Sequence, residues 1–493
     1  MHVIRRLLVM TVLLAFAGCA TEVALQQPTV RRGWDDSVLA ALDDAHQRLQ
    51  QVRDPEQRIS QALHIADALF EMEALEAADH YAQIAFRTLQ QSEYPLFDQA
   101  VTLIRVLYAL DQTAQADRLL QSTLDTLTLS GNEPLQGQYL TRILQLVFSL
   151  DEPTADQFRR ITDRVLFIGD PGIRSQVLRE TIQLMWQANF SGDVTGIVQH
   201  AIAATSGVDD RVAQAAGFIH LASLIELLNQ PIAGVDAEQI RARGLRIWRD
   251  ANLWSIGQLS AATAVQGSML TARAELLEEV LAGIPGNVAR VEILTKQAFW
   301  YIETGLLDQA ERLVEYAAQF SRAIDSAELR AGAVAQIGLV HQLLDDPATA
   351  QRRIEEAAAM SPRYWHTNPA AAYAAGRVLI ENGQFGRAVQ LIGSQRDPVH
   401  QVEAYLRLYS ELDDDTLAQS QSLLLRELPF LLRRIGWSRS NHLPDLVQQT
   451  IIRAARRGDT ALIAELRSIR PPQEMQVLLD SRYAQAMLER GAF

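Results

Sequence analysis

Residues that often carry catalysis occur throughout this chain, but they do not fall into a reactive arrangement. The sequence has no glycine-rich phosphate loop ending in Gly-Lys-Ser or Gly-Lys-Thr, no Gly-x-Ser-x-Gly elbow and no His-Glu-x-x-His zinc pair. His64 and His80 could approach each other within one helical hairpin, although histidines among helical residues of mixed polarity are usually structural or solvated. The run Asp413-Asp414-Asp415 lacks the alternating ligands and the spaced glutamate of a calcium loop and suits a solvated helix junction. We therefore expect no metal, no cofactor and no enzyme activity.

Four arginines recur at an interval that could place them along one surface. Arg174 and Arg211 are 37 residues apart, and Arg290 and Arg330 are 40 residues apart. A ladder of guanidinium groups on a concave surface could bind the carboxylates of an acidic or C-terminal peptide. The alternative, which we favour, is ion pairing with the abundant Asp and Glu of the chain itself, because surface charges are usually solvated or locally paired.

Aromatic side chains are the other candidate contacts with a partner. Tyr364 and Trp365 begin the most irregular interruption of the helical pattern, residues 364–369, and could form a binding loop. An aromatic plug between stacked helices is the alternative that we favour, because large rings fill such gaps. Trp300 is a third candidate contact, and it belongs to a set of tryptophans that could instead line a small-ligand pocket, although helical spacing also suits a core. That set is Trp186, Trp248, Trp254 and Trp300.

The single cysteine of the chain, Cys19, follows a stretch with the layout of a secretion signal. Arg5 and Arg6 precede an apolar run from Leu7 to Ala17. A membrane-spanning helix needs about 20 apolar residues, so this run is too short to span. The pattern predicts a signal peptide at residues 1–18.

The residues Phe16-Ala17-Gly18-Cys19 resemble the lipobox of bacterial lipoproteins, with Phe16 where leucine is usual. The resemblance implies that the signal is cut before Cys19, which is then acylated on its sulfur and its nitrogen. The alternative is an ordinary signal peptide that leaves a free thiol, but an unpaired cysteine in a secreted chain would then have no use. By resemblance to the sorting pattern of enterobacterial lipoproteins, Ala20 favours the outer membrane, facing the periplasm. The inner membrane and the cell surface stay open.

Composition narrows the class of the mature chain. The formal net charge of −14 argues against nucleic-acid binding, which needs a basic stripe. The sequence is 48% hydrophobic but only 6% aromatic, so its apolar residues are mostly the small and aliphatic ones, and Ala and Leu favour helix. With one cysteine, no disulfide can form within the chain, and stability has to come from packing.

The region from residue 34 to residue 493 has the pattern of packed helices throughout. Apolar residues recur at three- and four-residue spacing, and turn residues with helix-starting prolines separate the segments, as at Asp170-Pro171, Asp346-Pro347 and Asp397-Pro398. Residues 19–33 read as a short lipidated tether. We therefore predict an all-α solenoid of antiparallel helix pairs over residues 34–493.

Helix pairs can be superposed along the sequence. Ala298 and Tyr301 precede a turn at Gly305, and Ala310 and Ala317 follow on the second helix. Small residues on facing sides allow two helices to approach to about 8–10 Å. The same offsets recur in copies that begin at Ala66, Gly338 and Gly376.

This pattern resembles the tetratricopeptide repeat, whose small residue in the first helix and two alanines in the second match Ala298, Ala310 and Ala317. The resemblance covers four units. Elsewhere, as from Ile104 to Thr123, the pattern is degenerate, and the unit exceeds the 34 residues usual for the family. The resemblance implies pairs that stack into a superhelix and expose a surface for a protein or peptide.

The leading hypothesis is therefore a lipid-tethered scaffold that binds a protein or peptide partner of the cell envelope, in assembly or transport. One alternative is a peptidoglycan-processing enzyme like the superhelical lytic transglycosylases. Such an enzyme needs a catalytic glutamate in a Glu-Ser context, and residues 441–493 lack it and read as three further helices. The other alternative is a small-ligand receptor in a closed helical ring.

Overall fold

The structure is a computed structural model. It describes residues 34, 36–150, 155–188, 190, 192–229, 231–251, 258–270, 274–361, 364–366, 368–435, 443–469, 471 and 473–491. The predicted signal peptide, the tether and Cys19 lie outside these residues, and so does Trp254.

The described residues form the α-helices α2 to α25 and one 3-10 helix, η2, and no strand occurs among them. The prediction of an all-α solenoid is confirmed. The helices are α2 (Asp36–Gln51), α3 (Pro55–Glu71), α4 (Leu75–Gln91), α5 (Phe97–Ala109), α6 (Thr113–Leu129), α7 (Glu133–Phe148), α8 (Ala155–Val165), α9 (Pro171–Gln187), α10 (Thr195–Ser206), α11 (Arg211–Leu227), α12 (Ala237–Asp250), α13 (Gln258–Leu270), α14 (Ala274–Gly283), α15 (Asn287–Glu303), α16 (Leu307–Arg322), α17 (Ala327–Leu343), α18 (Pro347–Met360), η2 (Tyr364–His366), α19 (Pro369–Glu381), α20 (Phe385–Gly393), α21 (Pro398–Glu411), α22 (Asp414–Ile435), α23 (Leu443–Arg456), α24 (Thr460–Ser468) and α25 (Gln473–Gly491).

Side-chain caps start many of these helices at the residues that the sequence indicated. The Asp170 carboxylate accepts hydrogen bonds from the backbone N–H groups of Gly172 and Ile173, at 2.7 and 3.0 Å. Asp346 caps α18 and Asp397 caps α21 in the same way. Each of these three helices has proline in its first turn, where no backbone donor is needed.

One turn recurs between the two helices of a pair. Gly305 has a φ of 77° and Gly383 a φ of 71°, in the left-handed region that glycine adopts most easily. The next backbone N–H then bonds to a carbonyl five residues back, from Leu306 to Tyr301 and from Gln384 to Leu379. Residues other than glycine take this position in other pairs: Glu73, Asp111, Asn229 and Asp345. The recurrence supports the helix-pair register that the sequence predicts.

Small residues pack the pairs closely, as predicted. Ala298, Ala310 and Ala317 are fully buried. At Gly376 on α19, a Cβ atom would lie 2.8 Å from the Cδ1 atom of Ile392 on α20, so a larger residue there would require the Ile392 side chain to shift. Most of the buried apolar side chains form three clusters that follow one another around the molecule.

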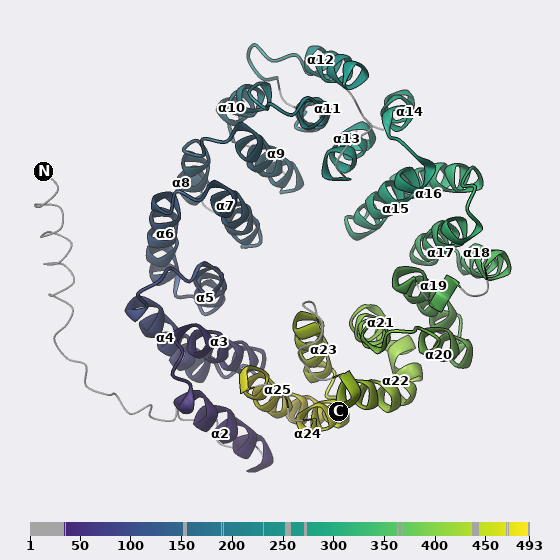
Figure 1. The fold of residues 1–493 in the computed structure, drawn as a ribbon. Coiled ribbons are helices and arrows are strands. Elements are labelled where there is room, and N and C mark those ends of the chain that lie inside the picture. Colours follow the sequence, from purple (N-terminus) through teal and green to yellow (C-terminus); the bar gives the residue numbers. More distant parts are fainter. Residues whose placement is uncertain are drawn as a thin grey trace, which may run out of the picture.

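The pairs are arranged in a ring (Figure 1). Odd-numbered helices from α3 to α25, the inner helices, lie toward its centre, and even-numbered helices, the outer helices, lie toward its outside (Figure 1). Each inner helix contacts the next one along the chain. None of the described helices is both long and apolar enough to cross a membrane.

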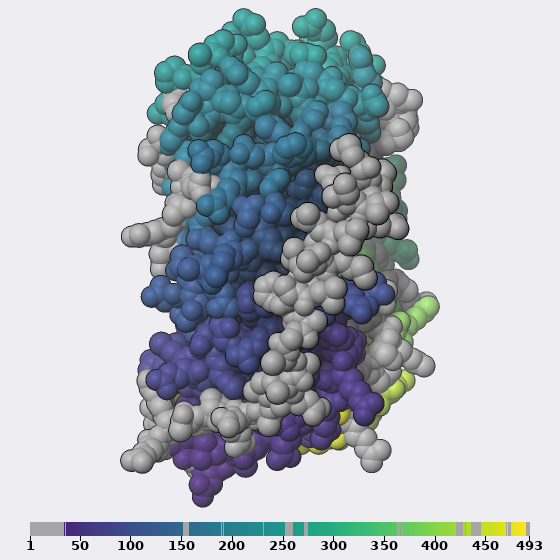
Figure 2. Space-filling model, turned by 90° about the vertical axis from the view of Figure 1, so that its left-hand side faces the viewer, coloured from purple at the N-terminus to yellow at the C-terminus, as the bar shows by residue number. Residues whose placement is uncertain are grey.

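The two ends of the array meet and close the ring. The last inner helix, α25, packs against α2 and α3 at the other end of the chain (Figure 1). Helix α2 thereby takes the place of the outer helix of α25, as α4 does for α3. In Figure 2, yellow C-terminal atoms lie against purple N-terminal atoms at this junction. We call the contact of α2 and α3 with α25 the seam.

Candidate functional site

The predicted arginine ladder lies at the starts of inner helices. Arg174, Arg290 and Arg330 each follow a helix N-cap by four residues, and each donates to the backbone carbonyl six residues earlier. These donor–acceptor distances are 3.0 Å to Ile168 and 2.8 Å to both Ile284 and Ile324. The three guanidinium groups are thus bonded to backbone, rather than to the acidic side chains that we favoured. Their binding of a partner stays a prediction.

Arg211 does not share this position, because it is the first residue of α11 and is exposed. Gln214 lies four residues after that N-cap instead and donates to the Ser206 carbonyl at 2.9 Å. Gln136 and Gln401 occupy the same position on α7 and α21 and also donate to preceding carbonyls. The useful signal in the sequence is therefore Arg or Gln four residues after a cap, which on α7, α9, α11, α15, α17 and α21 bonds the helix to the segment before it.

The aromatic candidates are largely packed. Trp365 is buried in the apolar cluster of helices α17 to α25, which fits an inter-repeat plug, and Tyr364 begins η2. Trp300 is partly buried and contacts the Tyr301 ring edge-on, with the ring centroids 4.9 Å apart. Trp248 is fully buried in the core. The tryptophans of the ligand-pocket hypothesis that are described thus include at least one core residue.

The other sequence candidates for chemistry lie in separate surroundings. His80 stacks edge-on against Tyr81 on the outer helix α4. His64 lies on the inner helix α3, where burial, the Arg482 charge and an opposing effect of Asp67 leave its pKa at about 4. Asp413 accepts a hydrogen bond from the Thr416 backbone N–H at 2.8 Å and so starts α22. No group of three or more potential metal ligands occurs among the described residues.

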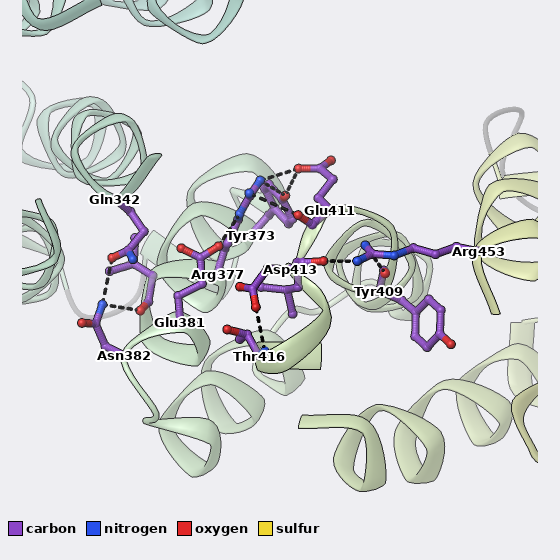
Figure 3. A network of polar contacts seen from close by, with 12 residues as sticks. Gln342, Tyr373, Arg377, Glu381, Asn382, Tyr409, Glu411, Asp413, Thr416 and Arg453 are labelled. Atoms are coloured by element: carbon purple, nitrogen blue, oxygen red, sulfur yellow. Dashed lines mark hydrogen bonds and ion pairs between the residues drawn. The ribbon is translucent and has the colours of Figure 1, made fainter. Parts of the chain in front are cut away.

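A polar network ties the inner helices α19, α21 and α23 together (Figure 3). Arg377 donates to Glu381 at 2.9 Å and to Glu411 at 2.6 Å. Arg453 reaches from α23 to the Tyr409 carbonyl at 2.8 Å. These guanidinium groups bridge successive repeats.

A second network crosses the seam on its inner side. Arg482 of α25 is fully buried and pairs with Asp67 and Glu71 of α3, at 3.1 Å from the latter. Arg456 of α23 donates to Glu71 at 2.6 Å, and Gln485 of α25 does so at 2.6 Å. Burial alone would raise the pKa of Glu71, but the hydrogen bond from Arg456 and the Arg482 charge lower it. Side chains about 400 positions apart in sequence are joined here.

A third set of charges holds α2 to the C-terminal helices. Asp480 is nearly buried and lies between Arg48 of α2, at 2.6 Å, and Arg467 of α24, at 2.8 Å. Burial raises the pKa of Asp480 despite these two cations. On the opposite side of α2, the His46 ring lies 2.8 Å from the Tyr81 hydroxyl of α4.

Two adjoining cavities open beside the seam, lined by residues of α3, α5, α23 and α25. One, of about 240 Å³, lies between α3, α5 and α23, and the other, of about 500 Å³, also reaches α25. They share Asp67, Arg105 and Val106 as wall residues, and we call them together the seam cavity. The sequence alone did not indicate this site, because its walls come from both ends of the chain.

The rest of the ring interior is lined by polar side chains. An inner helix is flanked by two inner helices and one outer helix, so exposed residues in its middle turns face the interior. Such residues on the described inner helices include Gln138, Gln145, Gln176, Lys296, Arg407 and Gln449. This surface can offer hydrogen bonds but has little apolar character, unlike the core of an obligate interface.

No protein-family model matches this sequence, and no curated protein matches it.

Proposed function

We propose that this chain is an envelope scaffold: a lipoprotein anchored through Cys19 to the outer membrane, facing the periplasm, whose helical ring binds a protein or peptide partner. The proposal combines the lipobox-like sequence with the helical-repeat fold. A tether keeps the binding surface at high local concentration beside the membrane. The mechanism is positioning, and we propose no catalytic step.

The observation that carries the proposal is the continuous inner wall of the closed ring. Its exposed side chains are polar and come from successive repeats, so an extended partner could contact several repeats at once. Glutamine side chains such as Gln138, Gln145 and Gln176 offer both a donor and an acceptor, which suits the backbone amides of a peptide. Helical-repeat proteins use such extended surfaces for binding.

Site-specific photo-crosslinking in intact cells tests the scaffold. A crosslinking amino acid at Gln138 or Lys296, on inner helices, should capture the same partner repeatedly. Matched probes at Arg118 and Ser122, exposed on the outer helix α6, should not. Equal capture from both sets, or no capture from correctly folded protein, would contradict binding through the inner wall.

The anchor has an independent test. Labelled palmitate should enter the wild-type protein and be absent from the Cys19→Ala variant. A wild-type protein that takes up no label would remove the lipoprotein assignment while leaving the scaffold question open.

A further inference from the structure

The larger part of the seam cavity has the volume and the mixed wall of a small-molecule site. It is partly open to solvent and has a volume of about 500 Å³, within the range of about 300–1,000 Å³ that is usual for ligand pockets. Phe70, Val106 and Ala109 supply an apolar side. Charged side chains from α3, α5, α23 and α25 also line the cavity.

Most of those charges are neutralised within the protein. Asp67 pairs with Arg482, and Glu71 pairs with both Arg456 and Arg482. In the smaller part of the cavity, Asp98 pairs with Arg142 of α7. The formal charges of these residues are thus balanced within the protein.

Two charged groups on the cavity wall remain unpaired. Arg105 of α5 lines both parts of the cavity, and Glu489 of α25 lines the larger part. Neither has a hydrogen-bond or ion-pair partner among the described residues, and they do not approach each other closely enough to pair. Glu489 is partly buried, which makes an unpaired carboxylate there more costly than one in open solvent. One cation, Arg105, and one anion, Glu489, thus line the same partly open cavity, although they are far apart in the sequence.

The smaller part of the cavity adds neutral hydrogen-bonding groups. His64 lines it with Gln448 and Ser60. Because the pKa of His64 is about 4, its ring is uncharged at neutral pH and can donate through one nitrogen and accept through the other. These groups match the amide N–H and C=O groups of a peptide backbone.

We propose that the seam cavity binds a zwitterion of the amino-acid or short-peptide class, with its carboxylate on Arg105 and its ammonium group on Glu489. A guanidinium and a carboxylate form charge-assisted hydrogen bonds, and the ammonium group gains the same from Glu489. The site exists only in the closed ring, because α5 and α25 bring its two charges together. It is separate from the inner-wall surface proposed for a protein partner.

Calorimetric titration of the purified mature chain with L-alanine, Ala-Ala and Ala-Ala-Ala tests this site. At least one of the three probes should bind, and their order distinguishes a free amino acid from a peptide. The N-acetylated and the C-amidated forms of the best probe should each bind about tenfold or more weakly, because each loses a charge-assisted bond.

Two variants assign the contacts. Arg105→Gln should weaken binding of the free probe about tenfold and remove the difference between its carboxylate and amidated forms. Glu489→Gln should also weaken binding of the free probe about tenfold, and it should remove the difference between the free and the N-acetylated probe. Arg118→Gln, on the outer helix α6, is the matched control and should bind as wild type.

The proposal would be overturned if none of the three probes bound at millimolar concentration. It would also be overturned if acetylating or amidating the probe, or the substitution Arg105→Gln, left the affinity unchanged. Circular dichroism should show unchanged folding in each variant, since Arg105 is exposed. Because these experiments use defined probes and purified protein, their outcome is independent of whether photo-crosslinking finds a protein partner.

Discussion

His220 lies in the buried middle of the inner helix α11. It is 5% exposed, and a Cβ atom on Gly267 would lie 2.6 Å from its Cα atom, so α13 packs directly against it. Burial, with a smaller effect of the Arg179 charge, lowers the pKa of His220 to about 3. Between about pH 3 and pH 6.5, the imidazole of His220 is therefore neutral in the folded protein, whereas it is protonated in the unfolded chain.

The lowered pKa predicts acid sensitivity. As pH falls below 6.5, the unfolded chain binds a proton at His220 that the folded chain does not bind until about pH 3, so the folded state loses stability. Between pH 6.5 and pH 5 this one group should cost about 2 kcal/mol. Urea unfolding at pH 7 and pH 5 should show a smaller loss in His220→Gln than in wild type. The exposed His200→Gln should behave as wild type, and equal losses in all three proteins would contradict the assignment.

Arg482 is the cation on which the inner side of the seam depends. Arg482→Met should lower the free energy of unfolding by about 3–5 kcal/mol, because Asp67 and Glu71 would lose their buried partner. Urea denaturation measures this loss. The exposed pair of Arg433 with Glu465 provides the control, since Arg433→Met should cost less than about 1 kcal/mol. Similar costs for both variants would show that Arg482 does not hold the seam.

At the scale of the element, each pair depends on its turn. Asp345 joins α17 to α18 with a φ of 60°, and Gly383 joins α19 to α20 with a φ of 71°. A side chain in this left-handed region meets steric conflict with its own backbone, although Asp tolerates it better than most residues do. The two turns have the same hydrogen-bond pattern and differ in the residue that occupies the position.

This pair of turns gives a reciprocal prediction. Asp345→Gly should raise the free energy of unfolding by about 0.5–1 kcal/mol, and Gly383→Ala should lower it by about 1 kcal/mol. No atom lies within 4 Å of a Cβ built on Gly383, so the second effect would be conformational rather than a packing clash. Thermal and urea unfolding measure both changes. Changes of the same sign would refute the common turn geometry.

At the scale of the whole molecule, α2 and α25 form a pair that no loop connects. Leu49 of α2 is fully buried, as are Val477 and Ala484 of α25 in the same apolar cluster. The N-terminal helix thus completes the last repeat, and neither end of the array presents an unpaired inner helix to solvent. The ring differs in this from an open repeat array, which needs separate capping units.

Because the ring is closed, a substitution in α2 should alter the stability of the helices at the C-terminal end of the chain. Leu49→Ala should destabilise the seam by about 2–5 kcal/mol and therefore speed amide hydrogen exchange in α25 by tenfold or more. Exchange in α15 to α18, across the ring, should stay as in wild type. Leu129→Ala, at a residue 86% exposed, is the control and should leave both regions unchanged. If the rate of amide hydrogen exchange in α25 were the same in Leu49→Ala as in wild type, the ring would be open in solution.

Local interactions let the sequence alone indicate most of the elements. Caps at Asp170, Asp346 and Asp397 and the turn glycine at Gly383 act within a few residues of their own position, so their effect can be read from neighbouring letters. The three helices expected in residues 441–493 occur as α23, α24 and α25. The repeat spacing likewise indicated which alanines pack between helices, because packing within a pair depends on residues close in sequence.

Only the tertiary structure decided that the array closes and where its cavity lies. The small rotation between one repeat and the next accumulates around the ring, and the total rotation cannot be predicted from the local sequence of any one repeat. The pairing of Arg482 with Asp67, and the meeting of Arg105 with Glu489 at one cavity, join residues from opposite ends of the chain. Nothing in the sequence distinguishes these residues from the other charged residues of the chain. They are brought together only because the ring closes.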